Sequence, residues 1–424
     1  MGRLIGILGI VTMIGIIFLL SSNRKAVKLR VIGWGLGLQF TFALIVLKTT
    51  PGKWFFQKMN DVVIGILNCA QAGASFVFGN LVQNSIPVTP TDVIDKSQSL
   101  PSFVANAGAM FAFSVLPTII FFSALMSVLY HYGVMQKLIE GMARVMSKTM
   151  KTSGAESLSA ASNIFVGQTE APLVVKPYLQ KMTLSELNAI MVGGFATIAG
   201  GVMAAYVGFL KDSIPNIAGH LLSASIMSAP AGLMMAKIMR PEVDSPETMG
   251  KYKLPVEKQT RNGIDAIAAG AGDGLKLALN VAAMLVAFIG IIALINLGLG
   301  LVSKDLSLSA IFGKIMAPLA WLMGIPWKDA SYFGDLLGTQ MTINEFVAYS
   351  KLQGYSALMD PRSAALATYA LCGFSNLSSV GIQIGGISAL APERRSDLSK
   401  LGLRAMLCGA FASWTTCCMA GILL

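Results

Sequence analysis

Two glutamates stand in apolar stretches of the sequence, where a carboxylate has few natural partners. Glu170 lies in the run NIFVGQTEAPLVV (163–175) and Glu345 lies in the run NEFVAY (344–349). At the depth of a lipid bilayer, a carboxylate costs on the order of 3 kcal/mol even on lenient insertion scales. Two such groups imply polar ligands for them, so the chemistry that they indicate is the binding of a polar solute or an ion inside a membrane.

The composition agrees with a membrane setting. Of the 424 residues, 54% are hydrophobic and only 12% are charged, and the mean hydropathy is +0.67. Such a chain cannot place its apolar surface in a water-facing globule, so we expect a polytopic membrane protein in contact with lipid. The net charge of +11 is assigned to cytoplasmic loops and not to a nucleic-acid partner. The five cysteines show no metal-ligand spacing and are expected to be packing thiols.

Eight stretches are long enough and nearly free enough of charge to cross the bilayer. They are residues 4–20, 31–47, 103–130, 182–210, 214–236, 277–303, 363–392 and 405–424. Three further segments are apolar but imperfect, namely 54–82, 154–175 and 331–349. Lys and Arg collect in short cytoplasmic loops, and two clean spans lie between each of the basic clusters at 24–30, 137–151, 237–261 and 394–404. This parity holds only if the imperfect segments make no net crossing, and both termini are then extracytoplasmic.

The imperfect segments are of two kinds. Segment 54–82 opens with an aromatic cluster and carries scattered polar residues, which is typical of a helix lying in the headgroup plane. The two segments with a glutamate are interrupted by polar and small residues, at Gly167–Glu170 in one and at Gly338–Gln340, leading to Asn344, in the other. We interpret both as re-entrant hairpins. Non-helical backbone at membrane depth is tolerated only where protein or a water-filled cavity satisfies it, so the hairpin tips should line a cavity.

An internal repeat supports this interpretation. The span after the first hairpin contains GGFATIAGG (193–201), and the span after the second contains CGFSNLSSVG (372–381). By the charge map these two units run in opposite directions, which is the pattern of inverted repeats with broken helices that meet at a midplane site. The expected fold is therefore all-α, with eight transmembrane helices, two re-entrant hairpins, an interfacial helix and unwound helices within an inverted repeat. Broken helix ends supply N–H groups to a solute and carbonyls to a cation, which favours a solute-plus-ion symporter.

The sequence also resembles a known family at these residues. NIFVGQTEAP, NEFVAY, CGFSNLSSVGIQIGG (372–386) and APERR (391–395) are similar to motifs of the concentrative nucleoside transporters of the bacterial, sodium-coupled type. The resemblance runs in the same order from about residue 100 to the C-terminus. It implies a homotrimer in the bacterial inner (plasma) membrane that imports nucleosides down a sodium gradient by an elevator-type movement.

The resemblance also implies a division into domains. Residues 1–150 would form scaffold helices with the interfacial helix, and 151–240 the transport-domain part with the first hairpin repeat. Residues 241–305 would form a cytoplasmic linker and a scaffold helix, and 306–424 the transport-domain part with the second hairpin repeat.

Substrate-binding residues are carried over position by position. The resemblance implies that Gln168, Thr169 and Glu170 on the first hairpin face the nucleobase, with Val202 and Phe374 packing near it. A base edge presents donors and acceptors, and its faces require apolar partners.

The ribose and the cation have their own implied sets. Glu345, Asn376 and Ser379 would hold the ribose, whose hydroxyls donate to carboxylate and amide oxygens. The sodium site would consist of Asn163, Val166, Thr197 and Ile198, with main-chain carbonyls from Val166 and Ile198.

Three alternatives remain beside sodium symport. A proton-coupled symporter could use Glu170 or Glu345, whereas a sodium site needs several hard oxygens, which Asn163 and Thr197 offer. A passive channel would give flux that is independent of any ion gradient. A membrane enzyme would use the two glutamates as acid and base, but the sequence holds no HExxH and no Gly-x-Ser-x-Gly motif, so no enzyme activity is expected.

Overall fold

The computed structural model describes residues 2–82, 85–88, 103–106, 111–250 and 260–424. The first half of the chain forms α1 (Gly2–Leu19), η1 (Arg24–Ala26), α2 (Leu29–Lys48), α3 (Thr50–Phe78), η2 (Gly79–Val82), β1 (Ser85–Val88), β2 (Phe103–Asn106), α4 (Phe111–Ser114), α5 (Leu116–His131), α6 (Val134–Met150), α7 (Gly154–Ser162), η3 (Ala171–Lys181), α8 (Leu184–Ala196), α9 (Gly200–Leu210) and α10 (Ile217–Met239). The second half forms α11 (Gly263–Val302), α12 (Leu308–Leu322), α13 (Trp327–Thr342), α14 (Glu345–Tyr355), α15 (Pro361–Ala370), α16 (Leu377–Leu390), η4 (Pro392–Arg394) and α17 (Arg395–Leu423).

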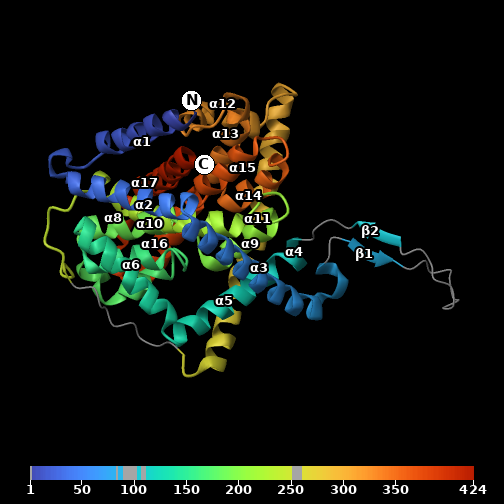
Figure 1. Cartoon of the computed structure of the whole chain (residues 1–424), viewed down its shortest axis with the longest axis horizontal. Coiled ribbons are helices and arrows are strands. Elements are labelled where there is room, and N and C mark those ends of the chain that lie inside the picture. Colours follow the sequence, from blue (N-terminus) through green and yellow to red (C-terminus); the bar gives the residue numbers. More distant parts are fainter. Residues whose placement is uncertain (1, 83–84, 89–102, 107–110, 251–259) are drawn as a thin grey trace.

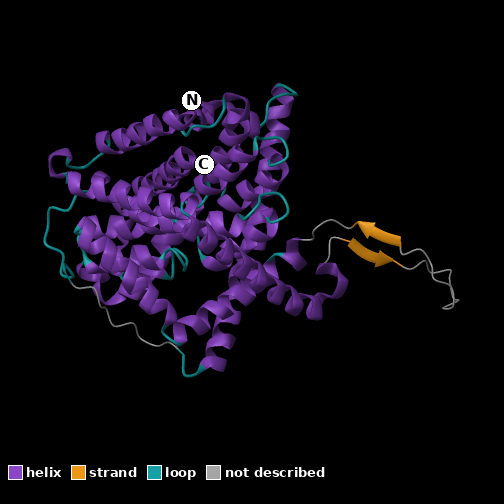
Figure 2. Cartoon of the chain, viewed as in Figure 1, coloured by secondary structure: helices purple, strands orange, loops and turns teal. Residues whose placement is uncertain are grey.

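The prediction of an all-helical fold is confirmed, with one small exception. Strands β1 and β2 pair antiparallel, Ser85 opposite Asn106 and Val88 opposite Phe103, and Figure 2 shows them projecting away from the helical body. The expected span 103–130 therefore starts too early, because its first residues form β2 and the apolar helix begins at Ala112. Residues 107–110 of that span lie outside the described residues, as do 251–259 of the third basic cluster.

Among the described residues, seven helices are long and apolar enough to cross a membrane, and eight if the bent pair α12–α13 counts as one span. Six of them match predicted spans. The seventh is α3 with η2, residues 50–82, which is long and apolar enough to cross although the sequence predicted a helix in the headgroup plane. Length and composition do not place this helix relative to a membrane, so its position in the headgroup plane stays a prediction. The first predicted span is the shorter apolar helix Leu4–Leu19. Helix α12 was missed, because Lys314 and an internal Pro318 interrupt its apolar sequence.

Both predicted hairpins are broken helix pairs. In the first, α7 ends at Ser162 and η3 starts at Ala171, so Gly167–Glu170 lies in the break as predicted. In the second, α13 and α14 pack together and the break falls at 343–344. The prediction that Gly338–Gln340 interrupts this hairpin is wrong, because these residues continue α13. A Cβ at Gly338 would clash with Phe312, so this glycine lets α12 and α13 approach closely.

The two predicted broken spans meet at their breaks. The first is interrupted at 197–199, between α8 and α9, and the second at 371–376, between α15 and α16. Ser375 Oγ donates to Phe195 O at 2.9 Å, and Ser413 Oγ on α17 contacts Cys372 O at 3.1 Å and Ala196 O at 3.3 Å. Side-chain hydroxyls thus satisfy the carbonyls that broken helices expose, and the two breaks lie at one place in the core.

Buried charges fix the starts of the first-repeat helices. Capping boxes at Ser153 with Glu156 and at Thr183 with Glu186 begin α7 and α8. Lys237 Nζ of α10 lies 2.6 Å from Glu156 Oε2 and 3.3 Å from an oxygen of Glu242, and all three side chains are nearly inaccessible. This cluster joins hairpin, span and the following linker into one packed unit.

The chain ends lie near each other. Helices α1 and α17 pack side by side, and the N- and C-terminal marks are adjacent in Figure 1. This arrangement is compatible with the prediction that both termini face the same side, and which side that is stays a prediction. Four cysteines are buried as expected, whereas Cys69 on α3 is exposed.

Candidate functional site

Glu345 is the centre of a cluster that joins three elements. Its side chain is only 5% exposed. Oε1 accepts from Tyr206 Oη of α9 at 3.1 Å, and Oε2 accepts from Asn376 Nδ2 at 2.8 Å. The carboxylate of the second hairpin therefore contacts both broken spans, as a site at the junction of inverted repeats requires.

Asn376 and Asn344 arrange the helix starts around this carboxylate. Asn376 is the N-cap of α16, and its Oδ1 accepts from Ser379 N at 2.8 Å. Asn344 caps α14 in the same way, accepting from Val347 N at 2.9 Å. Two helix N-termini, each with partial positive charge, thus begin beside Glu345. Such an arrangement suits a polar solute with hydroxyl groups, since it offers both acceptors and N–H dipoles.

The tip of the first hairpin reaches α16. Gln168 is 8% exposed; its Nε2 donates to Ser379 Oγ at 3.1 Å, and its Oε1 accepts from Gln383 Nε2 at 3.0 Å. Ser379 therefore lies between the two predicted subsites, because its N–H bonds Asn376 and its hydroxyl bonds Gln168. The structure thus brings together Gln168, Ser379, Asn376 and Glu345, which the sequence assigned to one site.

Thr169 and Glu170 are exposed at the same tip. A Cβ at Gly386 would lie 3.1 Å from Thr169 Cγ2, so Thr169 also faces α16. Glu170 Oε2 accepts from Gly167 N at 2.9 Å. No hydrogen bond in the described part of the chain joins Glu170 to the Glu345 cluster, so the structure does not link the two glutamates directly.

The two apolar residues assigned to the base are both buried. Val202 lies on α9 one turn before Tyr206 and on the same face, which places it toward the Glu345 cluster. Phe374 lies in the break before α16 and is 8% exposed. Both are therefore near the junction at which the polar residues meet.

The predicted cation residues lie at helix C-terminal ends. Asn163 is the C-cap of α7 and Thr197 is the C-cap of α8, where the helix dipoles favour a positive charge. Gly193 leaves room for this approach, because a Cβ there would lie 3.2 Å from Asn163 Nδ2. Val166 and Ile198 lie in the two non-helical stretches beside these caps.

These residues fit a small hard cation. Asn163 Nδ2 donates to Ser159 O, but Asn163 Oδ1 is buried without a hydrogen-bond partner. Thr197 Oγ1 donates to Gly193 O at 3.0 Å, so its lone pairs can still coordinate. In the described part of the chain, no hydrogen bond ends on the carbonyls of Val166 or Ile198. An orphaned amide oxygen, a hydroxyl and two open carbonyls form a set of oxygen ligands suited to sodium.

Sequence reasoning missed three residues of the site. Tyr206 is an aromatic in an apolar helix and gives no polar signal, although its ring stacks on Tyr349 at 4.1 Å and its hydroxyl holds Glu345. Gln383 is one helical turn after Ser379 in an apolar span, and that spacing could have identified it. Gln340 Nε2 donates to Leu371 O and Gly373 O, which supports the break from the hairpin side.

Three sequence families match the chain. They are described as Na+ dependent nucleoside transporter N-terminus over residues 8–81, nucleoside recognition over 112–213, and Na+ dependent nucleoside transporter C-terminus over 220–421. Together they cover most of the sequence, including both hairpins and both breaks.

Similar proteins from other organisms are also named as transporters. An uncharacterized transporter of Haemophilus influenzae is 42% identical over 100% of this chain and 98% of its own length. Sodium/nucleoside cotransporter 1 of Mus musculus is 39% identical over 99% of this chain. The chain spans 64% of that longer mouse protein.

Solved structures show the same fold. CNTnw in an inward-facing substrate-bound state has a TM-score of 0.89 and 38% sequence identity, and the match covers 100% of this chain and 98% of that chain. A variant of CNTnw in an outward-facing state matches with the same TM-score, identity and coverage. The arrangement of helices described above is therefore common to both of those structures.

Proposed function

Because the chain belongs to the Na+ dependent nucleoside transporter family, we propose that it is a symporter that imports nucleosides together with sodium. The sodium dependence of the family agrees with the predicted coupling ion. The named relatives are transporters and cotransporters, in agreement with the prediction that the chain is not an enzyme.

The observation that carries the proposal is the Glu345 cluster. A carboxylate has about four acceptor positions, and two are occupied by Tyr206 and Asn376. The others are available to a ligand that donates two hydrogen bonds, as the 2′- and 3′-hydroxyls of a ribose do. Gln168 and Gln383, with both donors and acceptors, would then meet the base edge near Phe374 and Val202.

Sodium would bind beside the nucleoside without contacting Glu345. Asn163 and Thr197 cap the helices that precede the two breaks of the first repeat, and Gly200 N of α9 donates to Phe165 O of the hairpin tip at 2.9 Å. A cation held by Asn163, Thr197 and the carbonyls of Val166 and Ile198 would join the hairpin to α8. It would thereby order Gln168, five residues after Asn163, for the nucleoside.

We further propose that the chain works as a homotrimer in the bacterial inner membrane, with an elevator-type movement of the transport domain against the scaffold. The hairpins and broken spans form one packed unit through Ser375, Ser413 and Lys237, as a body that moves rigidly must. Helix α6 packs against α7, so we place it with the transport domain, although it lies before residue 151.

Uptake into proteoliposomes tests the proposal. With an inward sodium gradient, labelled nucleosides should accumulate above their external concentration, and a panel of purine and pyrimidine nucleosides would define the preference. A passive channel would bring the internal concentration only to the external one, with or without sodium. That result would refute symport.

A further inference from the structure

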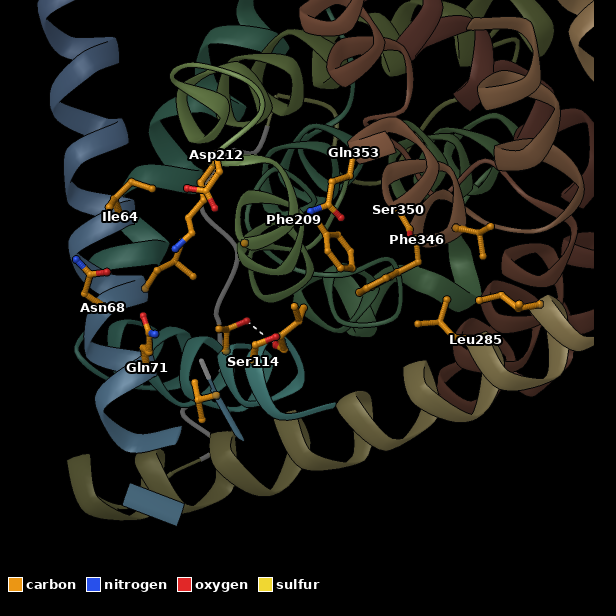
Figure 3. Close-up of a pocket in the computed structure, with 18 of the residues that line it drawn as sticks. Ile64, Asn68, Gln71, Ser114, Phe209, Asp212, Leu285, Phe346, Ser350 and Gln353 are labelled. Atoms are coloured by element: carbon orange, nitrogen blue, oxygen red, sulfur yellow. Dashed lines mark hydrogen bonds between the residues drawn. The ribbon is translucent and has the colours of Figure 1, made fainter. Parts of the chain in front are cut away.

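A cavity lies between the two sets of helices that would move against each other. It has a volume of about 750 Å³ and is lined by residues of α3, α5 and α11 on one side and of α9 and α14 on the other. We call it the outer pocket. Figure 3 shows Asn68 and Gln71 on one wall, Leu285 on another, and Phe209, Phe346 and Gln353 between them. The pocket is lined by the C-terminal end of α9 and the start of α5, which the charge map places on the extracytoplasmic side.

The outer pocket is chemically mixed. Asn68, Gln71, Ser350 and Gln353 are exposed in it, and none of these four side chains makes a hydrogen bond within the described part of the chain. Amide groups both donate and accept, so they can pair with either kind of group on a ligand. Apolar residues, the rings of Phe209 and Phe346, and the charged side chains of Lys211 and Asp212 also line the pocket.

The pocket is separated from the Glu345 cluster by one aromatic layer. Phe346 lines the pocket and directly follows Glu345 in the chain. Its ring packs edge-on against Tyr206 at 5.0 Å and against Phe209 at 6.0 Å, and Tyr206 is the residue that donates to Glu345. A solute in the outer pocket would therefore lie on the other side of this layer from the binding carboxylate.

We propose that the outer pocket is a low-affinity access site, in which an incoming nucleoside binds before it reaches Glu345. This inference rests on the proposed function. The volume is within the range of small-molecule sites, and the mixture of amides, a hydroxyl and aromatic rings matches the edges and faces of a nucleoside. A lipid chain is disfavoured as the occupant, because it would bury these amide groups without hydrogen bonds.

Protection of an engineered cysteine tests the proposal. Cys69 is the exposed cysteine among the described residues, so Cys69→Ser gives a quiet background, and Ser350→Cys places one thiol in the pocket. A charged thiol reagent added from the extracytoplasmic side should label this thiol, and uridine should slow the labelling. The protection should persist when Glu345→Gln disables the main site. It should need about tenfold more uridine than half-saturates uptake, because few groups contact the ligand there.

Two results would overturn the proposal. Labelling that uridine slows only when Glu345 is intact would mean that uridine acts through the main site, by moving the transport domain. Labelling that uridine never slows would mean that the pocket does not bind nucleoside. Either result leaves the proposed function standing if the same protein still accumulates uridine with sodium, so the two failures are distinguishable.

A glycine in the pocket wall allows a second test. Gly208 on α9 lines the pocket, and a Cβ there would meet nothing within 4 Å. Gly208→Trp should fill the space and lower the rate of uptake at low uridine concentration about tenfold, as loss of one step in binding would do. Equilibrium binding of uridine at the Glu345 site in detergent should stay unchanged. Gly141→Trp on α6, where a Cβ also meets nothing, is the matched control, and equal uptake by the two variants would refute the access site.

Discussion

Replacing Glu345 by Gln isolates the contact on which the proposed nucleoside site depends. In the structure, both carboxylate oxygens accept hydrogen bonds, from Tyr206 at 3.1 Å and from Asn376 at 2.8 Å. The new amide must turn its oxygen toward Asn376 Nδ2, because two NH2 groups cannot bond each other. Its own NH2 then faces Tyr206, and the acceptor positions for ribose hydroxyls are largely lost.

The magnitude follows from the number of bonds. A hydrogen bond to a charged group contributes about 1.5–3 kcal/mol, so losing two costs about 3–6 kcal/mol. At about 1.4 kcal/mol per factor of ten, uridine affinity should fall by about two to four orders of magnitude. Folding should be retained, since the substitution preserves the volume of the side chain, keeps the bond from Asn376 and lets the new NH2 donate to Tyr206 Oη.

The assay is equilibrium binding of uridine, 2′-deoxyuridine and 3′-deoxyuridine to purified protein in saturating sodium. In the native protein, each missing hydroxyl should cost about tenfold or more in affinity. In Glu345→Gln the loss of either ribose hydroxyl should cost less than about threefold in affinity, because the carboxylate that accepts from that hydroxyl is already absent. The effect of removing the hydroxyl is therefore coupled to the effect of the substitution. The exposed Glu393, which accepts from Gln180, supplies the control variant Glu393→Gln. Equal losses for the deoxy ligands in both proteins would refute the assignment of Glu345 to the ribose.

Further predictions concern the cation site, the buried ion pair and the contact between the two helix breaks. Asn163→Ala should raise the sodium concentration for half-maximal uptake and remove the thermal stabilisation by sodium, because the orphaned Oδ1 is lost; an unchanged sodium curve would count against it. Lys237→Met should destabilise the protein by about 3–5 kcal/mol, since it leaves a buried carboxylate unpaired, and adding Glu156→Gln should restore part of the thermal stability; failure of this rescue would show that the ion pair is not responsible. Gly373→Ala should abolish uptake, because its Cβ would lie 2.5 Å from Phe195 O. The control Gly381→Ala should transport normally, because a Cβ there meets nothing within 4 Å. Normal uptake by both variants would disprove the close contact between the two breaks.

The site residues that could be predicted from the sequence are those with a polar side chain in an apolar stretch. Glu345, Gln168 and Asn376 stand out because a polar side chain within an apolar run needs a partner, and the structure shows those partners. The breaks of the two spans were also predictable, since Gly and Ser cluster there. Tyr206 could not be found in this way, because an aromatic ring is ordinary in a membrane helix and only its hydroxyl reveals a role.

Whether a glycine marks a helix break or a close contact between helices could not be predicted from the sequence, for a physical reason. Gly167 marks a true break, whereas Gly338 lies within a helix and is needed for the close approach of Phe312. Both uses depend on the absence of a Cβ, so the sequence alone cannot distinguish them. The capping roles of Asn163 and Thr197 were likewise hidden, because helix ends are set by tertiary contacts at the junction as well as by local sequence.

The most direct test of sodium-linked nucleoside transport compares two driving forces in the same proteoliposomes. One sample has an inward sodium gradient at equal pH on both sides, and the other has an inward proton gradient without sodium. We expect labelled uridine to accumulate in the first sample and only to equilibrate, if it enters at all, in the second. Equal accumulation in the sodium-free sample would contradict the cation site at Asn163 and Thr197.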